Sequence, residues 1–158
     1  MQLFVMRHGQ ASPIAPSDQQ RPLTATGENE ASLMGKWLSK ASTQIDCIVA
    51  SPFVRAQQTA KLVQHALPYD VEIETLDMIT PSGSAPIAHD YLDGLLAVHK
   101  YQCVLFVSHM PFVSYFVAEL TYDGQSPIFQ TAGIAQINYD VSGMKGDLDC
   151  LISPFDLC

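Results

Sequence analysis

Two kinds of hydrophobic pattern alternate along this chain. Short apolar runs such as LFVM and CVLFVS have the length of β-strands, whereas longer stretches repeat apolar residues at every third or fourth position, as amphipathic helices do. The short runs predict strands at residues 3–6, 46–51, 71–76, 103–108, 134–140 and 148–153. The longer stretches predict helices at residues 24–41, 52–66, 84–99 and 111–121.

Strands that alternate with helices favour a parallel sheet with right-handed crossovers and helices on both faces. The last two predicted strands follow each other through the turn-rich segment 141–147, so we expect them to form an antiparallel edge. The predicted fold class is therefore α/β, a three-layer α/β/α sandwich with a mostly parallel sheet. Because 158 residues suffice for one sizeable core, we expect a single domain over residues 1–158.

Composition narrows the range of functions. Hydrophobic residues make up 47% of the chain, and no apolar stretch has the roughly 18 residues of a membrane-spanning helix. The N-terminus has no basic leader before its apolar run, so we expect no signal peptide and a cytoplasmic location. The net charge of −8 argues against nucleic acid as a partner. An anionic ligand would need a local positive site, which directs attention to the arginines.

Polar residues follow three of the predicted strands at the points where the strands end. Arg7 and His8 come after the first strand, Ser51 after the second, and Ser108 and His109 after the fourth. The carboxyl ends of parallel strands meet at one edge of a sheet, and ligands bind at that edge. The sequence therefore predicts that these side chains lie close together and form a site.

A further arginine, Arg55, lies at the start of a predicted helix that Ser51 is expected to cap and Pro52 to open. A cation in the first helical turn is unfavourable for the helix dipole unless an anion binds beside it. The alternative is an arginine that reaches solvent or a nearby carboxylate. Together with the residues at the strand ends, Arg55 favours an anion site.

These residue types suit phosphoryl transfer. The guanidinium groups of Arg7 and Arg55 stay charged and match phosphate oxygens with forked donors. A histidine that titrates near neutrality can be a nucleophile or a donor, the roles expected for His8 and His109. Such a site needs no metal or cofactor, and a metal on the two histidines would lack obvious carboxylate partners. The paired spacing of a zinc site is also absent from the four cysteines, Cys47, Cys103, Cys150 and Cys158.

Three segments occur in an order and at spacings that resemble the motifs of the histidine phosphatase superfamily, which has the phosphoglycerate-mutase-like fold. They are RHG at residues 7–9, SPFVRAQQTA at residues 51–60 and SHMP at residues 108–111. RPLTATG, TPSG and FQTAGIA extend the likeness over nearly the full chain. Within the superfamily, the chain is similar to the small bacterial phosphohistidine phosphatases.

The resemblance implies roles for individual residues. His8 would be the nucleophile that becomes phosphorylated, and a phosphate pocket would be formed by Arg7, Arg55 and His109. For Gly9 it implies a backbone that approaches the ligand and a carbonyl that holds the other ring nitrogen of His8, which would fix its tautomer. Arg21 is a candidate cation at the pocket rim, and the alternative is a surface arginine paired with an acid.

Larger members of the superfamily carry an acid after the third strand that protonates an alcohol leaving group. Here Met78 takes the corresponding position, and the adjacent Asp77 would point elsewhere if the backbone is extended. Imidazole, with a conjugate-acid pKa near ~6.5, leaves as a neutral ring once protonated and needs little acid catalysis. The departure from the family pattern therefore favours a phosphohistidine substrate.

We expect the partner to be a phosphohistidine-bearing protein, either a phosphotransfer domain or a phosphocarrier, that a monomeric enzyme receives in a shallow pocket. Two alternatives stay open. A small-molecule phosphomonoesterase or mutase would have to use Asp77 or Glu74 as its acid. A non-catalytic phosphoprotein-binding module would have no use for a nucleophile. The remaining histidines, His65, His89 and His99, are expected at the surface or at its boundary.

Overall fold

A six-stranded sheet forms the middle layer of the computed structural model, which describes residues 1–157. Its strands are β1 (Gln2–Arg7), β2 (Cys47–Ala50), β3 (Ile73–Thr75), β4 (Cys103–Ser108), β5 (Ile134–Asp140) and β6 (Lys145–Ile152). They lie in the order β3-β2-β4-β1-β5-β6. The pairs among β1 to β4 are parallel, whereas the β1–β5 and β5–β6 pairs are antiparallel. The predicted antiparallel edge is confirmed.

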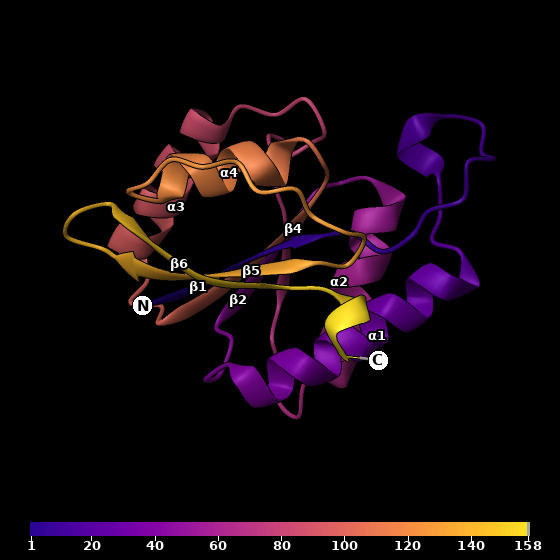
Figure 1. The fold of residues 1–158 in the computed structure, drawn as a ribbon, viewed down its shortest axis with the longest axis horizontal. Coiled ribbons are helices and arrows are strands. Elements are labelled where there is room, and N and C mark those ends of the chain that lie inside the picture. The colour runs from indigo at the N-terminus through magenta and orange to yellow at the C-terminus, as the bar shows by residue number, and fades with distance from the viewer. Residues whose placement is uncertain (158) are drawn as a thin grey trace.

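Helices cover both faces of the sheet. They are α1 (Ala25–Ala41), α2 (Val54–Ala66), α3 (Ala85–Val98) and α4 (Phe112–Leu120). One hydrophobic cluster joins the sheet to α1 and α2, and a second joins the other face to α3 and α4. Figure 1 shows α4 above the sheet and α1 below it. The three-layer α/β/α sandwich is therefore confirmed, and each predicted helix and strand has a counterpart with slightly different ends.

The first strand shows why these short runs are apolar throughout. Leu3 and Val5 pack into the cluster with α3 and α4, whereas Phe4 and Met6 pack into the cluster with α1 and α2. Successive side chains of a strand point to opposite faces, so a strand covered on both faces needs apolar residues at every position. Each fully buried side chain of this size contributes about 1.5–3 kcal/mol. This burial holds β1 in the centre and fixes the point where Arg7 leaves the core.

The start of α2 differs from the prediction. The helix begins at Val54 with Phe53 as its N-cap residue, so Ser51 does not cap it and Pro52 does not open it. The hydroxyl of Ser51 instead accepts a hydrogen bond from the backbone N–H of Phe53 at 3.3 Å, in a turn that precedes the helix. Arg55 still lies in the first turn of α2, as expected.

His89, expected at the surface or at its boundary, is more buried than a surface residue, with 8% of its surface exposed. Its ring is buried on α3, where the hydroxyl of Tyr139 lies 2.9 Å from Nε2 and a carboxylate oxygen of Glu119 lies 3.1 Å from Nδ1. These partners come from β5 and α4, so the helical pattern of residues 84–99 could not reveal them. His65 and His99 are exposed, as expected.

Two further properties concern the described residues. Cys47, Cys103 and Cys150 are free thiols, and Cys158 lies outside the described residues. Among the helices of residues 1–157, none combines the length and the apolar character needed to cross a membrane.

Candidate active site

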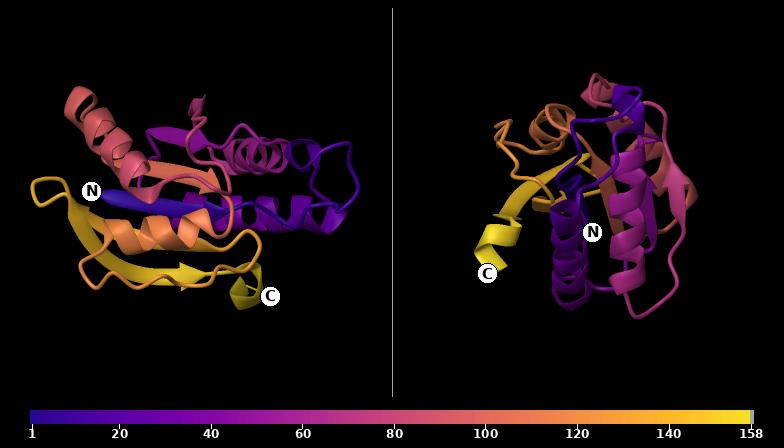
Figure 2. Two further views of the ribbon diagram at one scale, coloured as in Figure 1. Left: turned by 90° about the horizontal axis from the view of Figure 1, so that it is seen from above. Right: turned by 90° about the vertical axis from the view of Figure 1, so that its right-hand side faces the viewer.

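The strand register brings the predicted polar residues together. Arg7 pairs with Ser108 across β1 and β4, so the two strands end level with each other. The N–H of Ser51 donates to the carbonyl of Val107 at 3.0 Å, which aligns the end of β2 with the same edge. As a result the rings of His8 and His109 meet edge to face, with centroids 5.1 Å apart. The loop between β1 and α1 projects beyond this end of the sheet (Figure 2).

His8 is held in one tautomer. Its Nδ1 lies 2.7 Å from the carbonyl oxygen of Gly9, and because a carbonyl only accepts, Nδ1 carries the hydrogen. The lone pair of Nε2 is therefore available, and the Nε–H of Arg55 donates to it at 3.2 Å. Burial, together with the charges of Arg55, Arg7 and Arg21, lowers the pKa of His8 to about 4, although the hydrogen bond to Gly9 raises it. At neutral pH, His8 is an uncharged ring with its lone pair facing the arginines.

Gly9 is needed for a close backbone approach. A Cβ atom at this position would lie 2.5 Å from the carbonyl oxygen of Gly27, near the start of α1. The N–H of Gly9 donates to the hydroxyl of Thr59 at 3.1 Å, which ties the turn to α2. The backbone of Gly27 therefore packs against Gly9. The hydrogen bond between the carbonyl of Gly9 and Nδ1 of His8, which the resemblance implied, is present.

Arg55 is almost completely buried, with 4% of its surface exposed. Its Nη1 donates to the carbonyl of Asp18 at 2.6 Å, and its Nη2 lies 3.2 Å from a carboxylate oxygen of the same residue. The guanidinium also lies over the ring of Phe53, 5.1 Å from its centroid. A nearby carboxylate therefore does neutralise part of the Arg55 charge. Asp18 therefore belongs to the site, although the sequence analysis did not predict it. An acid in a long polar loop gives no sequence signal that it will contact Arg55.

Arg7 enters the site from β1. Its Nη1 donates to the carbonyl of Phe129 at 2.8 Å, whereas its Nε is buried without a partner. Burial lowers the pKa of Arg7 from its usual value and the charge of Glu30 raises it, but a guanidinium stays protonated in proteins. Arg7 therefore brings a positive charge with a donor that no described protein atom satisfies.

His109 has the same kind of unpaired atom. Its Nε2 lies 2.7 Å from the hydroxyl oxygen of Ser51, and its Nδ1 is buried without a partner. Burial, and then the neighbouring His8 and Arg55, lower the pKa of His109 to about 2, so this ring is also uncharged at neutral pH. Buried polar atoms are nearly always hydrogen-bonded, so Nδ1 of His109 and Nε of Arg7 are the atoms of this cluster that are free to contact a ligand.

Arg21 combines both of its predicted roles. Its Nη1 lies 3.1 Å from the carboxylate of Asp18, and its Nε donates to the carbonyl of Ser12 at 2.8 Å. About a third of its side chain remains exposed, which places it at the rim. Its charge is also among those that lower the pKa of His8. Arg21 is thus a surface arginine paired with an acid, and it still acts on His8 electrostatically.

The candidate acids do not join this arrangement of arginines and histidines. Asp77 and Met78 lie in a turn after β3 and not in an extended strand, and both are exposed. Glu74, on β3, accepts a hydrogen bond from the hydroxyl of Tyr91 at 3.1 Å. Its carboxylate lines a separate pocket.

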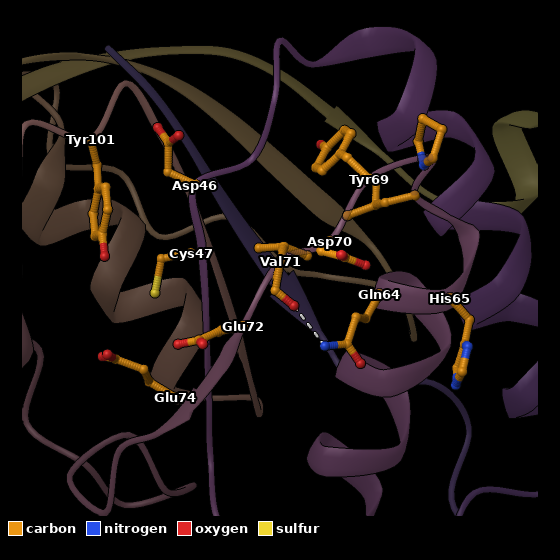
Figure 3. Close-up of a pocket in the computed structure, with 12 residues that line it drawn as sticks. Asp46, Cys47, Gln64, His65, Tyr69, Asp70, Val71, Glu72, Glu74 and Tyr101 are labelled. Carbon is orange, nitrogen blue, oxygen red and sulfur yellow. Dashed lines mark hydrogen bonds between the residues drawn. The ribbon is translucent and has the colours of Figure 1, made fainter.

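That pocket, of about 820 Å³, lies beside β3 and the beginning of β2 and is shown in Figure 3. Four carboxylates line it, those of Asp46, Asp70, Glu72 and Glu74, and no lysine or arginine does so. Because the carboxylates would repel phosphate, the pocket does not compete with the arginine site at the opposite ends of the strands. Within residues 1–157, no group of three or more His, Cys, Asp or Glu side chains has the arrangement of a metal site.

Comparison with known proteins shows the family of this chain. Residues 3–78 match the model of the histidine phosphatase superfamily (branch 1). Phosphohistidine phosphatase SixA of Escherichia coli is 40% identical over 157 residues, which cover 99% of this chain and 96% of that protein. This chain belongs to the histidine phosphatase superfamily. Its similarity to the SixA homolog of Haemophilus influenzae is 41% identity over 94% of this chain and 93% of that one.

Solved structures of the superfamily show the same architecture. A structure of the protein histidine phosphatase SixA complexed with tungstate has a TM-score of 0.94 and 39% identity, covering 100% of both chains. The fold class, including the phosphoglycerate-mutase-like architecture, is confirmed by this match. In this superfamily member, the four predicted residues Arg7, His8, Arg55 and His109 do lie together at one edge of the sheet.

Proposed function

We propose that this chain is a metal-independent phosphohistidine phosphatase that removes phosphate from a phosphohistidine on a protein through a phospho-His8 intermediate. The observation that carries the proposal is the state of His8, which is neutral, protonated on Nδ1 and surrounded by arginines. The SixA proteins of Escherichia coli and Haemophilus influenzae, whose names give this activity, support the same substrate class.

In the first step, the lone pair on Nε2 of His8 attacks phosphorus, and the P–N bond of the substrate breaks. The substrate ring, protonated on its far nitrogen, departs as neutral imidazole. Arg7 and Arg55 neutralise the charge on the phosphoryl oxygens, which is the main requirement of phosphoryl transfer. In the ligand-free protein, the Nε–H of Arg55 donates a hydrogen bond to Nε2 of His8. When Nε2 attacks, this N–H can donate to an oxygen of the phosphoryl group instead.

In the second step, water attacks the phosphorus of phospho-His8, gives its proton to the phosphate or to solvent, and the P–N bond to Nε2 breaks. Nδ1 keeps its hydrogen throughout, because the carbonyl of Gly9 holds it. His8 therefore leaves as a neutral ring without needing a general acid. The exposed positions of Asp77 and Met78 are consistent with a reaction that uses none at that place.

The test is to incubate the protein with a ³²P-labelled phosphohistidine-bearing phosphotransfer domain or phosphocarrier, in the presence of a chelator. We expect release of phosphate and transient acid-labile label on the enzyme. His8→Ala should abolish both, whereas His65→Ala, which removes an exposed histidine, should leave both unchanged. Undiminished phosphate release by His8→Ala would refute the proposal.

The same assay compares the two kinds of partner, because the phosphotransfer domain and the phosphocarrier are supplied separately and ranked by kcat/KM. We propose that residues 1–158 act as one domain, since one sheet carries both hydrophobic clusters, and that this domain is a monomer. A cytoplasmic location is part of the same proposal. Light scattering of the purified protein measures its oligomeric state.

A further inference from the structure

Ser51 contacts His109 but has no role in the two proposed steps of the reaction. It follows β2, has no exposed surface, and its hydroxyl oxygen lies 2.7 Å from Nε2 of His109. Its backbone N–H and C=O are already satisfied, by the carbonyl of Val107 and by the side-chain amide of Gln57. The orientation of the hydroxyl hydrogen is therefore decided by the partners of Oγ alone.

Counting donors and acceptors fixes that orientation. The N–H of Phe53 can only donate, and it donates to Oγ of Ser51 at 3.3 Å. Among the described residues, the second partner of Oγ is Nε2 of His109. If His109 donated here, the buried hydroxyl would accept twice and its own hydrogen would have no partner, which is unfavourable. If Ser51 donates, every group in the contact is satisfied.

We propose that Ser51 is a positioning residue that holds neutral His109 in the Nδ1–H tautomer, so that His109 donates a hydrogen bond to the phosphoryl group in transfer. The inference rests on the proposed function for its catalytic consequence. The tautomer itself is a property of the resting enzyme.

The unpaired atoms of the site agree with this assignment. Phosphoryl oxygens only accept hydrogen bonds, and Nδ1 of His109 is one of the two buried side-chain atoms without a partner in residues 1–157. With Ser51 donating to Nε2, Nδ1 carries a hydrogen and can serve as a donor. With the opposite tautomer, the lone pair of Nδ1 would face the phosphoryl oxygens and repel them. The other unpaired atom, Nε of Arg7, is likewise a donor.

Burial leaves each of the two histidines with a single N–H donor. Both rings are uncharged, and a neutral imidazole carries hydrogen on only one of its two nitrogens. The hydrogen on Nδ1 of His8 is held by Gly9, which leaves a lone pair for attack. The hydrogen on Nδ1 of His109 is directed to the ligand because Nε2 is occupied by Ser51. Two rings of equal charge thereby perform opposite tasks.

The first test observes the tautomer without turnover. In the ligand-free, ¹⁵N-labelled protein, long-range ¹H–¹⁵N correlations should show Nδ1 of His109 as the protonated nitrogen and Nε2 as the bare one, with the signals assigned from a His109→Asn variant. Ser51→Ala should shift this ring toward a mixture of tautomers. A resting His109 with its hydrogen on Nε2 would overturn the proposal, whatever the activity of the protein.

The second test measures the catalytic effect with a small phosphoramidate, so that protein docking plays no part. Loss of a preorganised donor should lower kcat about 10- to 100-fold in Ser51→Ala, with a smaller change in KM. Ser51→Thr keeps the hydroxyl and should restore most of the rate and the tautomer.

Thr121→Val is the matched control, because it removes a buried hydroxyl that donates to Val117 at the far end of α4. It should leave the tautomer and kcat unchanged. An unchanged kcat in Ser51→Ala would overturn the catalytic role of Ser51. Failure of the proposed function itself would instead appear as a wild-type protein that acquires no label on His8.

Discussion

The buried state of His8 predicts a specific loss of stability in acid. In the folded protein its pKa is about 4, whereas an unfolded histidine has a pKa of about 6.5. Because the folded pKa is the lower one, the unfolded chain binds more protons between these values, and the free energy of unfolding falls as the pH is lowered through this window. Above the window both states are neutral, so His8 adds almost no pH dependence there.

The two pKa values set the size of the effect. Integrating the proton uptake from pH 7 to pH 5 gives a loss of roughly 2 kcal/mol from His8 alone. The full loss, roughly 3 kcal/mol, is reached below pH 4, where both states are protonated. Losses of this size are large against the 5–15 kcal/mol that stabilise a typical domain.

Urea unfolding at several pH values between 7 and 5 measures the effect in the wild type, in His8→Gln and in His65→Gln. Glutamine removes the titrating ring, so His8→Gln should lose less stability on acidification than the wild type, by roughly 2 kcal/mol at pH 5. His65→Gln, which replaces an exposed histidine on α2, should follow the wild type. Equal acid dependence in His8→Gln and the wild type would show that His8 is not buried as a neutral ring.

Three further outcomes are expected. Arg55→Lys should lower kcat on a small phosphoramidate at least about 100-fold, because an ammonium cannot reproduce the forked contacts; a loss below threefold would contradict this role. Gly27→Ala should lower the free energy of unfolding by about 1–3 kcal/mol in urea titrations, because its Cβ would lie 2.0 Å from the carbonyl oxygen of Gln10. A variant as stable as the wild type would show that the backbone at Gln10 moves aside at no cost. Asp77→Asn should leave turnover of a phosphohistidine protein unchanged, and a tenfold fall would identify Asp77 as an acid.

The elements of the fold could be predicted because their causes are local. A strand covered on both faces needs an unbroken apolar run, as β1 and β4 have, and a helix on a sheet needs an apolar stripe. The antiparallel edge followed from the turn-rich segment between β5 and β6. The order of the strands could not be predicted from the sequence, because no feature of residues 103–108 indicates that β4 lies between β2 and β1.

The sequence predicted which side chains lie together when those side chains follow parallel strands. Arg7, His8 and His109 follow parallel strands, and parallel strands end at one edge. The prediction failed for contacts between loops. Asp18 meets Arg55 across 37 residues of sequence, and no pattern in the polar loop foretold that contact. The burial of His89 could not be predicted for the same reason, since Tyr139 and Glu119, which contact its ring, lie on other elements of the fold.

The sequence by itself determined which chemistry the site can perform, because it supplied two histidines and one arginine at the strand ends, a second arginine at the start of a helix, and no acid at Met78. Only the tertiary structure decided how each histidine is used. His8 and His109 occupy equivalent places in the sequence pattern, directly after a strand and its last polar residue. Burial makes both rings neutral, and the neighbour that each meets fixes its hydrogen, a carbonyl at Gly9 for one and a hydroxyl at Ser51 for the other. Protonation and tautomer depend on the packed surroundings, which exist only in the folded chain.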